Sequence, residues 1–307
     1  MSSSPKTTTP KRRSAEPIRR RSGASAGTAG RPTAALDRFE LEFWGVRGSL
    51  PAPGAATQKY GGNTPCLELR CGAQTLIFDL GTGARALGER MVSDGGPQQA
   101  AIFLSHYHYD HLQGVPFFPP FYVPGRRFRI FGATREGRTT REAIAGQMVP
   151  PYFPIGIDTL RASIDFEEVR VGRAIRVGDA RVRAFELNHP GGSLSFRVDF
   201  RGRSLVYATD SEFGSDRDAP FARFARGTDV LVYDALYTDE QYAKRRGWGH
   251  SPWSAAIEVA RAAQAKTLVL FHHDPAHDDR ELDRILRRAR ALRPGTLAAR
   301  EGDVHRL

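Results

Sequence analysis

Short runs of apolar residues dominate the chain from Phe39 onward, and they predict β-strands. Runs that are continuously apolar, such as Ile102-Phe103-Leu104, are typical of strands buried on both faces. Other runs alternate, as over residues 39–43, where one face of the strand meets water. The predicted strands are Phe39–Val46, Leu67–Cys71, Thr75–Leu80, Ala101–Leu104, Phe128–Phe131, Ala184–Leu187, Leu194–Phe200, Leu205–Ala208, Val230–Tyr233 and Leu268–Phe271.

Fewer segments show the apolar spacing of a helix. Over residues 279–292, apolar residues share one helix face opposite a row of arginines. Ser251-Pro252 favours an N-cap followed by proline at the first helical position. Strands come first, and strands interleaved with helices then follow twice, which predicts two packed sheets with helices outside, a four-layer αββα sandwich. The predicted helices are Ala84–Ser93, Arg141–Val149, Pro252–Ala265 and Asp279–Leu292.

Composition divides the 307 residues into a tail and one domain. Residues 1–36 contain eight basic residues and one acid, and they carry most of the net charge of +11. Because this segment has almost no large apolar residues, we expect a disordered basic tail before a single domain over residues 37–307. The tail is either a tether to nucleic acid or a solvated extension, and its composition favours the extension.

Several classes of protein are excluded by what the sequence lacks. No apolar run approaches the roughly 18 residues that a membrane span needs. The basic clusters of the tail precede no apolar region of a secretory signal, so we expect a cytoplasmic protein. Cys66 and Cys71 are the only cysteines, and their spacing fits neither a disulfide scaffold nor a Cys-x-x-Cys site.

Three of the nine histidines lie within the segment Ser105–His111, directly after the buried run over residues 101–104. Open α/β sheets place ligands at such strand ends. In an extended chain, His106 and His108 point the same way and can hold one metal ion together. Asp110 and His111 diverge and can address a second ion. Mixed imidazole and carboxylate ligands suit zinc, manganese or iron better than calcium or magnesium.

Further metal ligands are available at the ends of other predicted strands. His189 follows the run that begins at Ala184, Asp210 follows Leu205–Ala208, and His272 follows Leu268–Phe271. Each is a polar residue at the end of an apolar run, so it projects from a sheet edge rather than from a core. Together with the histidine cluster, these residues predict a dinuclear metal centre.

The segment His106-Tyr-His-Tyr-Asp110-His111, with the later strand-end ligands, resembles the metallo-β-lactamase superfamily over residues 39–307. Within that superfamily the chain is most similar to the phosphodiesterase branch, which includes ribonuclease Z and cyclic-nucleotide phosphodiesterases. Four shorter segments carry this closer resemblance: Gly45–Ser49, Tyr60–Cys66, Phe78–Gly83 and Gly249-His250-Ser251.

The resemblance implies a role for each matching residue. Two divalent ions, zinc first with manganese and iron as alternatives, would hold a water that attacks a phosphodiester. Asp110 would also orient this water, His250 would bind the phosphate or protonate the leaving group, and Asp234 would orient His250. Asp234 stands where the family more often has glutamate. The implied ligands are His106, His108 and His189 for one ion, Asp110, His111 and His272 for the other, and Asp210 as the bridge.

Weaker expectations concern residues around this site. Arg47 and Asn63 lie in glycine-rich turns and are candidate substrate-binding residues, Arg47 as a fork onto a phosphate. Of the adjacent histidines, His272 is expected to face the metals and His273 the opposite side. His277 is expected to be solvated.

The sequence favours one class of substrate and leaves alternatives. A small phosphodiester such as a cyclic nucleotide is favoured, because no long basic arm of the ribonuclease Z type is evident between His111 and His189. The proline- and aromatic-rich stretches 114–124 and 150–154 could stack a base or form core or dimer contacts. The alternatives are transfer-RNA 3′ processing of the ribonuclease Z type, thioester or lactone hydrolysis, and nucleic-acid binding through the tail. A homodimer stays open, and no membrane partner is expected.

Overall fold

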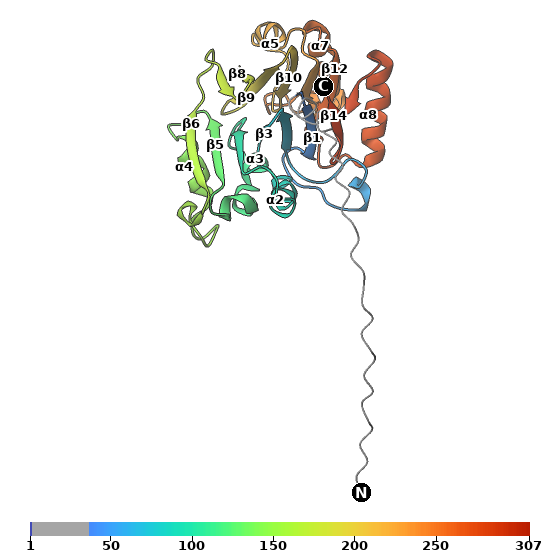
Figure 1. The fold of residues 1–307 in the computed structure, drawn as a ribbon. Helices are drawn as coiled ribbons and strands as arrows, with labels where there is room; N and C mark the ends of the chain where they lie inside the picture. The colour runs from blue at the N-terminus through green and yellow to red at the C-terminus, as the bar shows by residue number, and fades with distance from the viewer. Residues whose placement is uncertain (2–36) are drawn as a thin grey trace, which may run out of the picture.

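Two seven-stranded sheets form the centre of the molecule, which is seen here in a computed structural model (Figure 1). The structure describes Met1 and residues 37–307, so the expected tail lies outside the described residues apart from Met1. The first sheet has the order β14-β1-β2-β3-β4-β5-β6, and the second has the order β13-β12-β11-β10-β9-β8-β7.

The first sheet pairs antiparallel from β14 to β3 and parallel from β3 to β6. The second pairs antiparallel from β7 to β10 and parallel from β10 to β13. The strands of the first sheet are β1 Phe39–Gly45, β2 Cys66–Cys71, β3 Gln74–Phe78, β4 Gln99–Phe103, β5 Arg127–Gly132, β6 Ser163–Glu168 and β14 Val304–Arg306. Those of the second are β7 Ile175–Val177, β8 Ala180–Leu187, β9 Ser193–Phe200, β10 Arg203–Ala208, β11 Val230–Asp234, β12 Thr267–Phe271 and β13 Leu297–Ala298.

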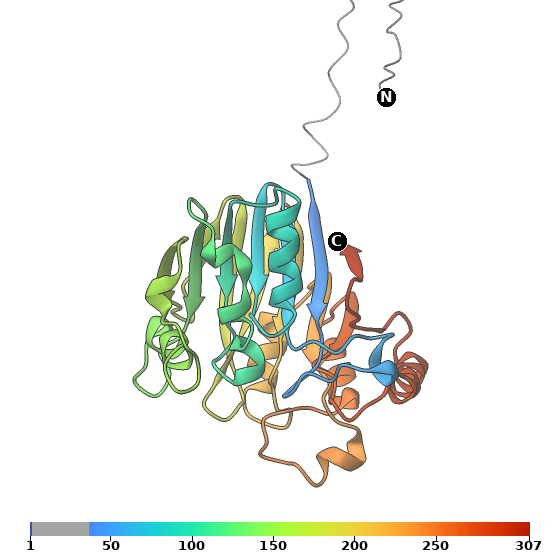
Figure 2. The ribbon, with the colours of Figure 1, turned by 90° about the horizontal axis from the view of Figure 1, so that it is seen from below.

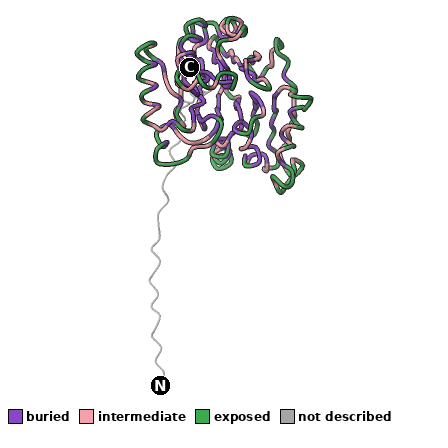
Figure 3. The backbone as a smooth tube through the Cα atoms, turned by 180° about the vertical axis from the view of Figure 1, so that it is seen from behind, coloured by how far each residue is buried: buried purple, intermediate pink, exposed green. Residues whose placement is uncertain are grey.

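Aromatic side chains fill the space between the two sheets. Phe103 of β4 stacks on Phe131 with ring centroids 4.7 Å apart, and it also packs on Phe196 of the opposite sheet at 5.3 Å. Phe78 meets both Phe196 and Tyr207 across the same interface. The central strands are buried (purple in Figure 3), with one face in this core and the other under helices. Their sequences are therefore continuously apolar.

Helices lie on the outer face of each sheet (Figure 1), and Figure 2 shows those that cover the first sheet. On the first sheet, Leu87 and Met91 of α2 pack on Ile77 and Ile102. On the second, helices α5, α7 and α8 bury their apolar faces against β10, β11 and β12. The fold is therefore the predicted four-layer αββα sandwich. The helices are α2 Ala84–Ser93, α3 Tyr109–Leu112, α4 Thr140–Gln147, α5 Asp218–Phe224, α6 Asp239–Tyr242, α7 Trp253–Ala262 and α8 Asp279–Leu292, with short 3₁₀ turns at Ala55–Thr57, Val115–Phe117, Pro119–Tyr122 and Ile157–Thr159.

The ten predicted strands are all present, with ends that shift by a few residues. The strands β6, β7, β13 and β14 were not predicted, because they are short or half-exposed edge strands with little apolar pattern. The expected N-cap at Ser251 is wrong. Helix α7 begins at Trp253 with Pro252 at the N-cap position, and Ser251 Oγ instead donates to the carbonyl of Ser211. Among the described residues, no helix is long and apolar enough to cross a membrane.

Candidate active site

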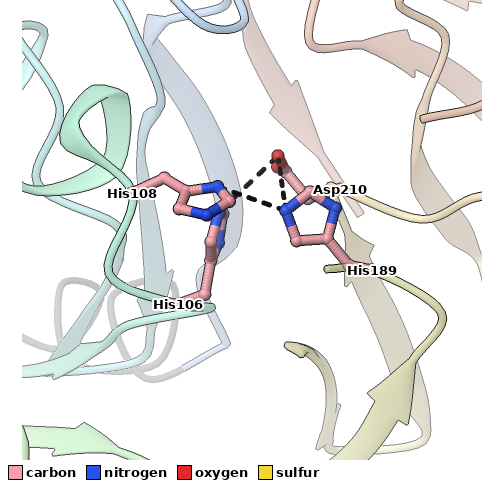
Figure 4. Close-up of side chains that lie close together, drawn as sticks. All are labelled: His106, His108, His189 and Asp210. Carbon is pink, nitrogen blue, oxygen red and sulfur yellow. Dashed lines mark hydrogen bonds and ion pairs between the residues drawn. The ribbon is translucent and has the colours of Figure 1, made fainter. Parts of the chain in front are cut away.

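Asp210 lies at the centre of a cluster of histidines at the carboxyl ends of strands from both sheets. Its Oδ1 lies 3.7 Å from Nε2 of His106 and 3.9 Å from Nε2 of His189 (Figure 4). Nδ1 of His108 lies 3.2 Å from Nε2 of His189. These four side chains offer ligand atoms that all lie within 4.8 Å of one another.

A second group of ligand atoms converges on the other oxygen of the same carboxylate. Asp210 Oδ2 lies 3.2 Å from Nε2 of His111 and 3.3 Å from Nε2 of His272. Oδ2 of Asp110 lies 3.2 Å from each of the same two nitrogens. One carboxylate thus faces two clusters, which is the arrangement that a ligand bridging two metal ions requires.

The chemistry of the donor set fits divalent cations. Nε2 of His106 is buried and has no hydrogen-bond partner among the described residues. Burial lowers the pKa of His106 well below its usual range, and burial also lowers the pKa of His189 and His108. These imidazoles are therefore neutral at pH 7, and the neutral ring is the form that binds metal ions. Lone pairs that converge without an intervening proton favour a cation between them.

The local backbone turns sharply where three key side chains leave their strands. Asp79, Asp210 and His272 have φ values of 58°, 57° and 62° in the left-handed region. This region is uncommon for residues other than glycine and costs about 1 kcal/mol or more at each position. Each turn directs a polar side chain from a strand end into the site, so the strain lies where the function requires it.

Asp79 fixes the orientation of His111 through a hydrogen bond to its ring. Nδ1 of His111 donates to Asp79 Oδ2 over 2.9 Å, which leaves Nε2 free to bind a metal. The hydroxyl of Tyr207 and the backbone N–H of Ser105 donate to the same carboxylate, each over 2.7 Å. Asp79 directly follows the apolar residues 76–78, and an acid after an apolar run is the same signal that singles out Asp210, so this role could have been predicted.

The turn at Gly48-Ser49 supports the second cluster. A Cβ atom at Gly48 would lie 2.5 Å from Nδ1 of His272, so only glycine leaves room for this ring. The backbone N–H of Ser49 donates to Asp110 Oδ2 over 2.7 Å. Burial raises the pKa of Asp110, but the neighbouring His111 and His272 outweigh it and hold the pKa of Asp110 well below its usual range. Asp110 is therefore a carboxylate at neutral pH.

His250 lies beside the clusters, in the loop that leads into helix α7 at Trp253. Its Nδ1 donates to Asp234 Oδ2 over 2.9 Å, and its ring stacks on His272 with centroids 5.1 Å apart. Asp234 is completely buried and also accepts the backbone N–H groups of Ser251 and Asp210, each over 3.0 Å. Burial lowers the pKa of His250, but Asp234 outweighs this effect and raises the pKa to about 9. His250 is therefore protonated at neutral pH.

Glu212 supports the loop that precedes His250, and sequence reasoning missed it. Its carboxylate accepts the backbone N–H groups of Gly247 and Gly249 over 2.7 and 2.9 Å. The carbonyl of Gly249 in turn accepts a hydrogen bond from Nδ1 of His189 over 2.9 Å. Gly249 has φ +88°, and a Cβ atom there would lie 2.3 Å from that nitrogen. No local sequence pattern marks Glu212, because its role depends on contact with the loop that contains Gly247 and Gly249, which lies at least 35 residues later in the chain.

The two expected substrate-binding residues make their polar contacts elsewhere. Arg47 is completely buried, and its guanidinium donates to the backbone carbonyls of Gly61 and His277. The amide of Asn63 donates to Glu301 over 2.9 Å. Both residues thus bind together parts of the chain near the site, and Nη2 of Arg47 is buried without a hydrogen-bond partner among the described residues.

The remaining histidines also have defined surroundings. His273 faces away from the clusters, as expected, and its Nε2 donates to the carbonyl of Ala299 over 2.9 Å. The expectation that His277 is solvated is wrong. Its side chain is buried, and its Nε2 lies 3.0 Å from Oε1 of Gln241. Helix α6, which carries Gln241, lies against it, and a sequence pattern does not reveal this contact.

Comparisons with known proteins show the family and the fold of this chain. A family model described as the beta-lactamase superfamily domain matches residues 75–273, and the chain belongs to this superfamily. Ribonuclease Z of Archaeoglobus fulgidus is 22% identical over 315 residues, covering 86% of this chain and 96% of the relative.

Solved structures show the same fold. The metallo-beta-lactamase fold protein YhfI of Bacillus subtilis has a TM-score of 0.67 and 18% identity, covering 88% of this chain and 99% of YhfI. A diphosphatase of the PhnP family has a TM-score of 0.65 and 19% identity, covering 88% of this chain and 98% of the diphosphatase.

Proposed function

We propose that this protein hydrolyses phosphodiester bonds with the help of two divalent metal ions, zinc first, with manganese and iron as alternatives. The observation that carries the proposal is the placement of Asp210 between two histidine clusters, beside the His250–Asp234 pair. The clusters account for metal binding. The adjacent protonated histidine supplies a cationic donor that an anionic substrate needs. The name of the ribonuclease Z relative supports the same class of reaction.

Seven side chains hold the metal ions in this proposal. When bound, two such ions would stabilise charge on the attacked phosphate and lower the pKa of a water between them. The carboxylate of Asp210 would serve both ions, because each of its oxygens faces a different cluster. The ligands of one ion are His106, His108 and His189, and those of the other are Asp110, His111 and His272.

The chain's own groups position the reactants and move the proton. Asp110, held by the N–H of Ser49, accepts a hydrogen bond from the attacking water and orients it. His250 carries its Nδ1 proton toward Asp234, so its Nε2 proton is available to a phosphate oxygen or to the leaving alkoxide. Asp234 keeps the ring charged and in this orientation.

A small phosphodiester is the favoured substrate. A cavity of about 390 Å³ opens beside His106 and His108, which is within the range for small-molecule sites. Transfer-RNA 3′ processing is the second candidate, and the ribonuclease Z relative over nearly the full chain favours it. Thioester and lactone hydrolysis remain as outcomes of the assay below.

The test is a panel of substrates offered to zinc- or manganese-loaded protein. It contains bis(p-nitrophenyl) phosphate, a thioester, a lactone and a precursor transfer RNA. We expect turnover of the phosphodiester, and we expect it to collapse in His250→Ala while the bound metal, measured by plasma mass spectrometry, is retained. Turnover of the thioester or lactone alone would overturn the proposal.

A further inference from the structure

The cavity that favours a small substrate lies next to the first metal cluster, and its far end is lined by residues that have no role in the proposed bond cleavage. His106 and His108 form one end, and helix α3, helix α4 and the glycine turn at 190–192 form its walls. The hairpin 135–138, in the segment that connects β5 to α4 (green in Figure 2), also lines the cavity. A substrate bound to the metal centre therefore has room to extend in this direction.

A tight turn of the backbone holds two arginines, Arg135 and Arg138, in the lining of this cavity. The backbones of Arg135 and Arg138 exchange two hydrogen bonds, of 3.0 and 2.8 Å. Glu136 and Gly137 between them have φ values of 48° and 76°. Positive φ at both central positions is the two-residue hairpin turn that suits a twisted antiparallel pair. The two arginines are thus held opposite one another by the backbone rather than by a flexible loop.

The two arginines differ in their partners. Arg135 forms an ion pair with Glu186, with 2.8 Å between Nη1 and Oε1, and a Cβ atom at Gly192 would lie 2.5 Å from the same Nη1. Arg135 is therefore neutralised and packed in place. Arg138 is exposed and forms no ion pair within the described part of the chain. Glu136, in the turn, is the carboxylate nearest in sequence that also lines the cavity.

The other titratable groups at this cavity leave Arg138 as its available cation. His106 and His108 are at the metal end, where they serve as neutral ligands. Tyr107 donates its hydroxyl to the carbonyl of Ala133 over 2.8 Å, so it forms wall rather than a binding group. A guanidinium with free donors beside a phosphoryl-transfer site suits a phosphate group.

An exposed aromatic ring lies on the same side of the site. Tyr109 begins helix α3 between the ligands His108 and Asp110, and it is 79% exposed. Exposed aromatic rings at nucleic-acid and nucleotide sites stack on bases, and such stacking tolerates any base. The cavity thus combines the metal centre, a planar ring and a cation.

We propose that this cavity binds a nucleoside next to the scissile phosphodiester, that the nucleoside carries a second phosphate, and that Arg138 selects for that phosphate. The inference rests on the proposed phosphodiesterase function. In it, Tyr109 stacks on the base, and Arg138 is a specificity-determining residue that takes no part in the bond cleavage.

Binding is measured first, because it does not depend on turnover. The metal-loaded protein is titrated calorimetrically with thymidine 3′,5′-bisphosphate and with thymidine 5′-monophosphate. We expect the bisphosphate to bind about tenfold tighter or more, as a charge-assisted arginine–phosphate contact gives. Arg138→Ala should remove this preference, and Arg138→Lys should retain part of it. Arg173→Ala is the matched control, because Arg173 is exposed and does not line the cavity.

Turnover then separates this inference from the proposed function. The substrates are thymidine 5′-(p-nitrophenyl phosphate) with and without a 3′-phosphate. We expect Arg138→Ala to raise KM for the 3′-phosphorylated ester about tenfold with little change in kcat. If wild type and Arg138→Ala both hydrolyse the two esters with the same kcat/KM, the role of Arg138 is overturned and the proposed phosphodiesterase function stands. Selective binding without any hydrolysis would overturn the proposed function and leave the cavity's preference standing.

Discussion

Nδ1 of His250 lies 2.9 Å from Oδ2 of Asp234, and the same carboxylate oxygen accepts the backbone N–H of Asp210 over 3.0 Å. The proposed proton donor, His250, and the proposed bridging ligand, Asp210, are therefore held by one buried acid. This contact connects the chemistry of the substrate to the geometry of the metal centre.

Replacing this acid tests the pair directly. We expect Asp234→Asn to reduce kcat on a phosphodiester about 100-fold, because a neutral amide neither keeps His250 charged nor orients its Nε2 proton. The metal content should remain that of the wild type, since Asp234 is not among the proposed ligands. A variant with wild-type kcat, measured on bis(p-nitrophenyl) phosphate, would remove His250–Asp234 from the mechanism.

The proposed bridging role of Asp210 predicts that both ions are lost together when its carboxylate is neutralised. Asp210→Asn removes one anionic oxygen from each cluster, so we expect both metal sites to weaken together. Plasma mass spectrometry after dialysis should find well under one ion per chain, with circular dichroism still showing the folded protein. Retention of a full complement of metal would contradict the bridge.

Asp79 should affect metal affinity without touching a metal. Its carboxylate holds Nδ1 of His111, so we expect Asp79→Asn to weaken metal binding about 10- to 100-fold, as for other partners of metal-bound histidines. Tyr207→Phe serves as the control, because it removes one hydrogen bond to Asp79 and leaves His111 paired. Competition with a metal chelator measures both variants, and equal affinities in the two would count against the role of Asp79.

Two glycines of one loop provide a matched pair of substitutions. Gly247 and Gly249 have φ values of 85° and 88°, so alanine at either position carries the same backbone strain of about 1–2 kcal/mol. Alanine at Gly247 meets open space, whereas alanine at Gly249 would press on His189. We expect Gly249→Ala to lose metal binding and activity, and Gly247→Ala to lose only stability in urea unfolding. Similar activities would show that His189 tolerates displacement.

The core between the sheets predicts a stability effect that is separate from the site. Phe103 is completely buried and packs on Phe131 and Phe196, so Phe103→Ala should lower the free energy of unfolding by about 3–5 kcal/mol. Phe117 is 57% exposed, and Phe117→Ala should cost far less. Urea titration of both variants measures the difference, which would vanish if the sheets did not pack as described.

The sequence predicted the parts of this structure that depend on local pattern. The apolar runs define the buried strands because both of their faces are covered. His106, His108, Asp110 and His111 are conspicuous because one short segment carries them. Other residues act through contacts between distant segments: Asp79 reaches His111 from another strand, and Glu212 fastens a loop near His189.

Burial of polar side chains is the other property that the pattern does not reveal. Arg47 lies in a glycine-rich turn, as surface arginines often do, yet it is completely buried and binds backbone carbonyls. His277 lies in a polar segment but is buried against helix α6, which carries Gln241. In both cases the covering chain comes from elsewhere in the sequence, so only the three-dimensional structure shows it.

Titration of metal-free protein with zinc, followed by hydrolysis of bis(p-nitrophenyl) phosphate at each step, tests the central claim most directly. The placement of Asp210 between two clusters predicts that activity rises until about two equivalents of zinc are bound per chain and then levels off. Full activity at one equivalent, or no phosphodiester hydrolysis at two, would contradict a dinuclear phosphodiesterase.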